Sequence, residues 1–229
     1  MSPLIIGLLT ILVYAPTLWV RYTLWRYKED LADIPGTGGE LAVHLIERFG
    51  LVDVTVEECN PGQDHYNPSE KIVRLSPDIY NGKSLTAIAV ATHEVGHAIQ
   101  FQRNDPTCLL YQKYYPWALK IQRIGIGLFS IPIFSVFMAS PAISLLTILL
   151  AASVMLSSAV IHLIVLPQEW DASFNKAMPI LKEGKYLDSA HLPKVHNILR
   201  AAALTYFASA LADVLRCWRW GGLFRGLRF

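Results

Sequence analysis

The segment His93-Glu-Val-Gly-His97 combines residue types that could build a zinc site. Residues four apart lie on the same face of an α-helix, so both imidazoles could point at one ion. Zinc accepts neutral imidazole nitrogens as ligands, and Glu94 stands beside them, placed to take a proton from water that the metal activates. The motif therefore predicts hydrolysis by metal-activated water, with His93 and His97 as ligands and Glu94 as the general base.

A catalytic zinc site needs a third protein ligand and keeps its fourth position for water. No third histidine follows at the close spacing of H-E-x-x-H-x-x-G-x-x-H, because residues 98–103 contain neither glycine nor histidine. A glutamate from a second helix is the common alternative. The third ligand must therefore come from another part of the chain.

The composition excludes several classes of protein. Of 229 residues, 53% are hydrophobic and 17% are charged, whereas a soluble domain carries about 25% charged residues. Residues 124–166 contain no Lys, Arg, Asp or Glu, which argues against both an ordinary soluble domain and a disordered chain. The net charge of +2 gives no sign of nucleic-acid binding. Three widely spaced cysteines without a CxxC pair exclude a disulfide scaffold or a four-cysteine zinc site.

Two apolar segments predict membrane-spanning helices. Residues 3–20 are long enough for one span, and the basic residues after it favour an uncleaved anchor over a signal peptide. Residues 124–166 are long enough for a helical hairpin, with its turn at Ala139-Ser-Pro141. Basic residues flank these spans on one side, so the positive-inside rule places residues 21–123 and 167–229 in the cytoplasm.

Residues 21–123 predict a small cytoplasmic α+β domain of the zincin kind. A helix begins within Gly36-Thr-Gly-Gly-Glu40 and ends at Gly50. Alternating apolar residues over 52–58 and a short apolar run over 71–75 predict two strands, with turn signals between them. An alanine-rich helix over 84–103 carries the zinc motif.

The C-terminal region, which follows the third-ligand segment within residues 167–229, admits two interpretations. Residues 201–212 are apolar but short, and a span would have to include Asp213 and Arg216, each costing about 2.5–3.5 kcal/mol at membrane depth. An amphipathic, membrane-associated helix is favoured, and a span over 201–220 is the alternative. The predicted fold is an α-helical membrane protein with about three transmembrane helices, or a fourth in the alternative, plus the cytoplasmic α+β domain.

This topology selects Glu169 as the third ligand. The hairpin returns the chain to the side of His93, and Glu169 and Asp171 are the first carboxylates after it. Two histidines and one glutamate form an established catalytic set, and Asp171 could orient a ligand imidazole. His162, two helical turns before Glu169, could belong to the site or to a packed interior. Candidate donors to a tetrahedral oxyanion, for which turn or packing roles are the favoured alternative, are His65, Tyr66 and Tyr206.

Five blocks of sequence, taken in order, resemble a known family. They are Asp64-His-Tyr-Asn-Pro68, Val73-Arg-Leu-Ser76, the segment from Ser84 to Gln100, Leu166-Pro-Gln-Glu-Trp-Asp-Ala-Ser173 and Ala201-Ala-Ala-Leu-Thr-Tyr206. Over nearly its whole length the chain resembles the neutral, membrane-bound zinc metallopeptidases (YugP-like). The resemblance implies a bacterial-type integral membrane zinc peptidase of the gluzincin kind, with His93, His97 and Glu169 as zinc ligands and Glu94 as catalytic base.

One position departs from the better-known membrane gluzincins. In those proteins an aspartate follows the ligand glutamate by four residues. Here that position is Ser173, and an aspartate stands at 171 instead. The departure leaves the part played by Asp171 open.

The predicted function is that of a membrane-embedded zinc metallopeptidase of a bacterial-type cytoplasmic membrane, with its active site facing the cytoplasm near the membrane surface. Its expected partners are peptide or membrane-protein substrates and the lipid bilayer, and no nucleic acid. The alternative is a non-catalytic membrane scaffold with a structural metal, which would need a fourth ligand such as Asp171 or His162. A transporter is disfavoured because the predicted spans include no pair of broken helices.

Overall fold

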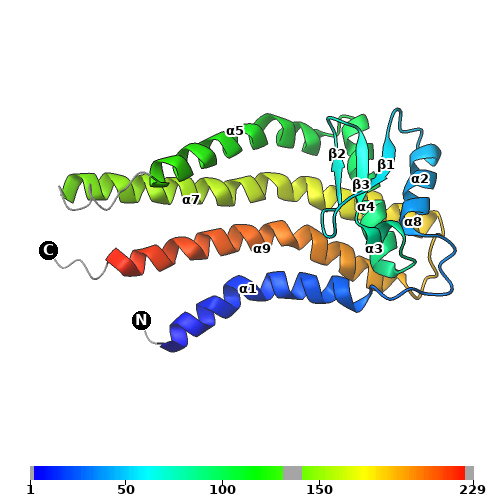
Figure 1. The fold of residues 1–229 in the computed structure, drawn as a ribbon, viewed down its shortest axis with the longest axis horizontal. Coiled ribbons are helices and arrows are strands. Elements are labelled where there is room, and N and C mark those ends of the chain that lie inside the picture. Colours follow the sequence, from blue (N-terminus) through cyan, green and yellow to red (C-terminus); the bar gives the residue numbers. More distant parts are fainter. Residues whose placement is uncertain (1–2, 131–140, 225–229) are drawn as a thin grey trace. The chain divides into compact units, whose positions relative to one another are not determined.

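The computed structural model describes residues 3–130 and 141–224 (Figure 1). The chain forms two compact units. The first, which we call the motif unit, comprises residues 18–109 and 167–204, and the second, the helical unit, comprises residues 1–17, 110–166 and 205–229. Four long helices contribute residues to both units: α1 (Pro3–Arg26), α5 (Pro106–Ser130), α7 (Pro141–Trp170) and α9 (Leu192–Phe224).

The motif unit contains a small mixed sheet. Its strands are β1 (Thr55–Glu58), β2 (His65–Asn67) and β3 (Ile72–Leu75), in the order β1-β3-β2. β1 runs parallel to β3, whereas β2 runs antiparallel to β3. The short helices of the unit are α2 (Gly38–Arg48), α3 (Pro77–Tyr80) and α8 (Met178–Glu183), and a π-helix, η1 (Asp171–Ala177), follows α7 directly.

Local sequence explains where α2 begins and ends. The Thr37 side chain accepts a hydrogen bond from the backbone of Glu40, whose carboxylate accepts one from the Thr37 backbone, and these reciprocal bonds form a capping box. After the helix, Gly50 adopts a φ of +60°, a conformation that favours glycine. Gly38 is required for packing, since a Cβ there would lie 2.3 Å from the Ile79 carbonyl oxygen.

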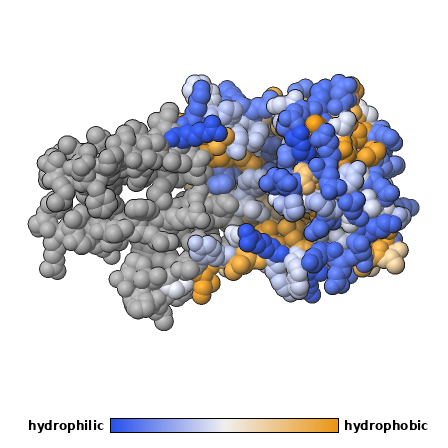
Figure 2. All heavy atoms as spheres, in the orientation of Figure 1, coloured by the Kyte–Doolittle hydropathy of each residue, from blue (hydrophilic) through white to orange (hydrophobic). Residues whose placement is uncertain are grey.

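Helix α4 (Leu85–Gln102) lies at the centre of the motif unit. Ser84 caps its first turn by accepting a hydrogen bond from the Ala87 backbone. Nearly every residue from Leu85 to Gln100 is buried, because α4 packs against α2, α3, the sheet and η1 at once. Hydrophilic residues cover much of the described surface on the face in Figure 2, while the apolar side chains of α2, α4 and β3 form the core.

The helical unit consists of the described parts of α1, α5, α7 and α9 that lie outside the motif unit. Within it, the rings of Tyr111 and Tyr115 stack one turn apart on α5, with centroids 4.6 Å apart. The ring of His162 on α7 lies beside that of Tyr206 on α9, with centroids 6.3 Å apart. His162 is therefore half-buried next to an aromatic ring rather than exposed.

The prediction of three transmembrane helices, or four, is wrong for the part of the chain that the structure describes. No described helix there has the length and apolar character needed to cross a membrane. Two of the helices combine apolar and charged turns: α1 ends with Arg21 and Arg26, and α5 carries Lys113, Lys120 and Arg123. Hydropathy along the sequence does not show where a helix ends, and these two helices extend beyond their apolar turns into charged ones.

Two related expectations concern particular segments. The turn of the expected hairpin, at residues 139–141, lies outside the described residues except for Pro141, where α7 begins. The C-terminal segment 201–220 lies within α9.

Candidate metal centre

Helix α4 presents two imidazoles on one face. His93 and His97 stand one turn apart, with ring centroids 4.6 Å apart and an angle of 81° between the ring planes. Their Nε2 atoms approach to 3.2 Å. Both side chains are buried, so the α-helical spacing has placed two nitrogen donors together away from bulk water.

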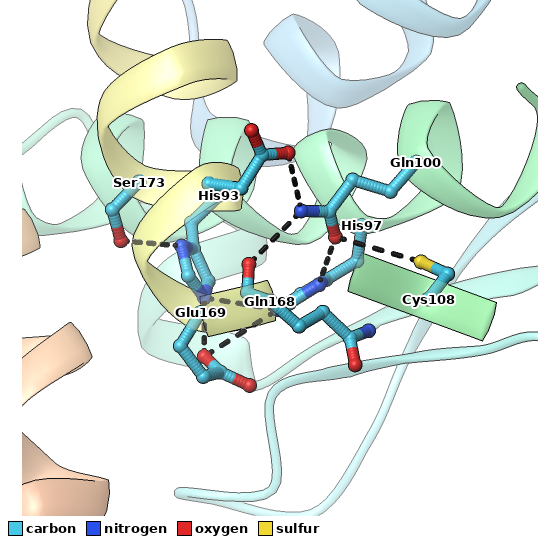
Figure 3. Close-up of polar contacts among 8 residues, drawn as sticks. His93, His97, Gln100, Cys108, Gln168, Glu169 and Ser173 are labelled. Atoms are coloured by element: carbon cyan, nitrogen blue, oxygen red, sulfur yellow. Dashed lines mark hydrogen bonds and ion pairs between the residues drawn. The ribbon is translucent and has the colours of Figure 1, made fainter. Parts of the chain in front are cut away.

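The last turn of α7 brings a carboxylate to the same point (Figure 3). The Oε2 atom of Glu169 lies 3.2 Å from the Nε2 atom of His93 and 3.5 Å from that of His97. Among the residues that the structure describes, these three form the one group of three or more histidine, cysteine or acidic side chains whose ligand atoms all lie within 4.8 Å of each other. Residues 76 positions apart in sequence thus meet in one cluster.

The three donor atoms fit the geometry of zinc. Zinc–nitrogen bonds of about 2.0–2.1 Å in a tetrahedral site place neighbouring ligand atoms about 3.3 Å apart. The separations here are 3.2, 3.2 and 3.5 Å. Two imidazoles and one carboxylate are also a donor set of zinc hydrolases, which leave a fourth position for water. The residues present could therefore hold this ion.

Burial and mutual contact shift the pKa values of the acidic and basic groups. Burial alone would raise the pKa of Glu169, but the neighbouring His97 and His93 hold it well below its usual value. Burial alone would lower the pKa of His97, but the charge of Glu169 and its hydrogen bond raise that pKa to about 9. Burial raises the pKa of Glu94, which lies on α4 next to His93. Glu169 and His97 therefore each favour the charged form of the other, although both side chains are buried.

Each histidine uses its second ring nitrogen to bind a buried neutral side chain. The Nδ1 atom of His93 lies 3.1 Å from the Ser173 hydroxyl, and that of His97 lies 2.9 Å from the Oε1 atom of Gln100. Ser173 and Gln100 are both fully buried. Such partners orient metal-binding imidazoles and influence metal affinity. Ser173 stands four residues after Glu169, the position of the aspartate in the better-known gluzincins.

Sequence reasoning missed Gln100. Its position three residues after His97 was a usable signal, because residues three apart share a helix face. A polar amide among the apolar residues at the end of α4 also needs a buried partner. Asp171, a candidate for orienting an imidazole, accepts a hydrogen bond from the Nε2 atom of Gln100 at 2.7 Å.

The π-helix positions Asp171 and Ser173 relative to α4. π-helical turns are rare and are frequently found at functional sites. Gly96 faces η1, and a Cβ there would lie 3.0 Å from the Ala172 carbonyl oxygen. The absence of a side chain at Gly96 therefore allows α4 and η1 to pack closely enough for Ser173 to reach His93.

The three residues considered as oxyanion donors lie in different parts of the structure. His65 is exposed on β2 and its Nδ1 atom lies 2.6 Å from the Gln63 carbonyl oxygen. Tyr66 packs its ring against Phe101, with centroids 5.7 Å apart. Tyr206 belongs to the helical unit. These contacts fit the turn and packing roles that were the favoured interpretation.

The structure thus brings together His93, His97 and Glu169, and it places Glu94 on the same helix as the two histidines. The metal-binding role of the first three and the catalytic role of Glu94 stay predictions. The carboxylate of Asp171 contacts other side chains: besides Gln100, it accepts a hydrogen bond from Asn175 at 2.7 Å and forms an ion pair with Lys176 at 3.1 Å.

Comparisons with known proteins identify related sequences. Residues 2–225 match the family described as "Putative neutral zinc metallopeptidase". The chain is 32% identical over 222 residues to a Bacillus subtilis (strain 168) protein named "Putative membrane protease YugP", an alignment that covers 94% of this chain and 95% of the relative. No solved structure matches the chain.

Proposed function

The chain belongs to this "Putative neutral zinc metallopeptidase" family, and on that premise we propose that it hydrolyses peptide bonds with a bound zinc ion. In this proposal His93, His97 and Glu169 hold the zinc, and Glu94 is the general base. The observation that carries the proposal is the triangle of donor atoms, with sides of 3.2, 3.2 and 3.5 Å, formed by side chains from two helices.

The side chains of the chain have separate tasks in this proposal. Zinc, when bound, would supply Lewis acidity toward the substrate carbonyl and would make water more acidic. Glu94 accepts the proton of the attacking water and delivers it to the leaving amine nitrogen. Burial of Glu94 limits competition from bulk water for that proton. Gln100 and Ser173 hold the two imidazoles in place.

One experiment tests the proposed function directly. Purified protein is expected to contain about one zinc per chain, because the described residues offer one set of three donors. It should cleave a casein-type substrate, lose that activity when a chelator removes the metal, and regain it when zinc is restored. Zinc bound without any cleavage would favour the structural-metal alternative, and failure to bind zinc would contradict the proposal.

We further propose that the enzyme acts at the cytoplasmic surface of a membrane on peptides or membrane proteins. The relative from Bacillus subtilis is named a membrane protease. On α1, Tyr22 and Trp25 are exposed beside the basic residues Arg21 and Arg26. Aromatic side chains favour the lipid headgroup region, and basic side chains are attracted to the anionic lipids of the cytoplasmic leaflet.

Vesicle binding tests this location. Each basic residue near an anionic surface contributes about 1 kcal/mol, so the double substitution Arg21→Gln and Arg26→Gln should weaken binding to phosphatidylserine-containing vesicles by about 30-fold. Sedimentation with vesicles gives the bound fraction. Pure phosphatidylcholine vesicles serve as the control, since both proteins should bind them equally. Equal binding of the two proteins to the anionic vesicles would contradict the proposed contact.

A further inference from the structure

The side chain of Gln100 lies between His97 of the candidate metal centre and the charged side chain of Asp171, which in turn contacts Lys176. Gln100 is fully buried on α4. Its Oε1 atom lies 2.9 Å from the Nδ1 atom of His97. Its Nε2 atom donates to the Gln168 carbonyl oxygen at 2.9 Å and to the Oδ2 atom of Asp171 at 2.7 Å (Figure 3). One amide thus contacts a candidate ligand and the segment that carries Glu169.

These contacts determine which way the amide points. A backbone carbonyl only accepts hydrogen bonds, and so does an ionised carboxylate. The Nε2 atom of Gln100 faces the Gln168 backbone carbonyl, which has no hydrogen to give, and the Asp171 carboxylate, which also contacts the Nζ atom of Lys176 at 3.1 Å. Both amide hydrogens of Gln100 are therefore used on its Nε2 side, and its oxygen must face His97.

The orientation of the amide in turn determines which ring nitrogen of His97 carries the hydrogen. An amide oxygen can only accept, so the Nδ1 atom of His97 must carry the hydrogen. In the neutral form that binds a metal, the lone pair is then on Nε2, the atom that faces His93 and Glu169. Ser173 cannot impose the same choice on His93, because a hydroxyl can either donate or accept.

We propose that Gln100 is a positioning residue that fixes the metal-binding tautomer of His97, and that Asp171 acts on the metal centre only through Gln100. This inference rests on the proposed zinc site. It assigns Asp171 an indirect role: its charge orients an amide, and the amide orients the imidazole. Ser173 holds the other imidazole independently, since its bond goes to His93.

Zinc dissociation constants, measured by competition with a chelator, test the proposal. Gln100→Met removes the acceptor at similar volume. It should raise the Kd by about 10- to 100-fold, the range for loss of a side chain that hydrogen-bonds a metal ligand. Gln100→Glu keeps an oxygen acceptor for His97 but loses the hydrogens that the Gln168 carbonyl and Asp171 accept, so it should also bind zinc more weakly than the unaltered protein. In the zinc-loaded protein, the hydrogen-bonded Nδ1–H signal of His97 should be visible by NMR and should disappear in Gln100→Met.

A double-mutant cycle separates the indirect role of Asp171 from a direct one. Asp171→Asn should raise the Kd by about tenfold in the unaltered background and have no further effect when Gln100 is already Met. Ser173→Ala is the matched control, because it acts on the other histidine and should raise the Kd by the same factor in both backgrounds. If Asp171→Asn raises the Kd by the same factor in the Gln100→Met background, the proposed indirect role of Asp171 is overturned.

The outcomes distinguish this inference from the function on which it rests. If the unaltered protein binds no zinc, the proposed function fails and the inference fails with it. If the unaltered protein binds zinc, and Gln100→Met binds it equally well with the Nδ1–H signal retained, only the role of Gln100 is refuted.

Discussion

Replacing Glu94 with glutamine is expected to lower kcat by about 100-fold or more while zinc stays bound, because the amide cannot accept a proton from water. The substitution preserves volume at a buried position on α4. The three donor atoms of the candidate centre belong to other residues. Steady-state kinetics on a peptide substrate and zinc content of the same preparation measure the two quantities together.

Glu47→Gln is a suitable control for this change. Glu47 is an exposed glutamate on α2, so the same loss of charge there should leave kcat unaltered. Near-native activity of Glu94→Gln, with zinc retained, would show that Glu94 is not the base. A loss of zinc with a loss of activity would instead indicate that Glu94 supports metal binding.

Elements whose boundaries depend on neighbouring residues could be predicted well from the sequence. The helix expected over residues 84–103 is α4, Leu85–Gln102, and its cap is Ser84. The helix expected between Gly36 and Gly50 is α2, Gly38–Arg48. Capping and chain reversal are local interactions, so the residues that determine them lie within a few positions. The strands β1 and β3 also fall within the expected ranges.

Features that depend on distant contacts were harder to predict. β2 lies in a region interpreted as turns, and it becomes a strand because β3 offers it hydrogen bonds. The π-helix η1 has no pattern that hydrophobic periodicity would detect, and it forms where α7 continues past Glu169 against α4. The bond from Gln100 to Asp171 joins residues 71 positions apart, so neither side chain alone indicates it.

The predicted membrane spans rested on mean hydropathy, which does not distinguish apolar side chains that are exposed from those that pack inside a protein. In the segment expected to be an anchor, Val20 is buried, whereas Ile11 and Leu18 are exposed. The choice of Glu169 as third ligand rested on that topology. In the structure, Glu169 reaches His93 and His97 because η1, which follows α7 directly, packs against α4.

Glu169→Gln is expected to weaken zinc binding by more than about 100-fold, beyond the range for loss of an outer-shell partner. Glutamine has nearly the same shape but no negative charge, so the centre would keep two neutral imidazoles and lose its anionic donor. The Oε2 atom of Glu169 is the atom that approaches both histidines, at 3.2 and 3.5 Å. Chelator competition gives the Kd, and zinc analysis of the purified variant gives the occupancy.

Asp171→Asn is the matched control, because it removes the same charge two residues further along the chain. Its carboxylate oxygens already contact Gln100, Asn175 and Lys176, so it should act as an outer partner and weaken zinc binding by only about tenfold. Full zinc binding by Glu169→Gln with a complete loss in Asp171→Asn would reverse the assignment. The carboxylate of Asp171 would then have to leave Lys176 and Gln100 to reach the metal, and η1 would have to rearrange.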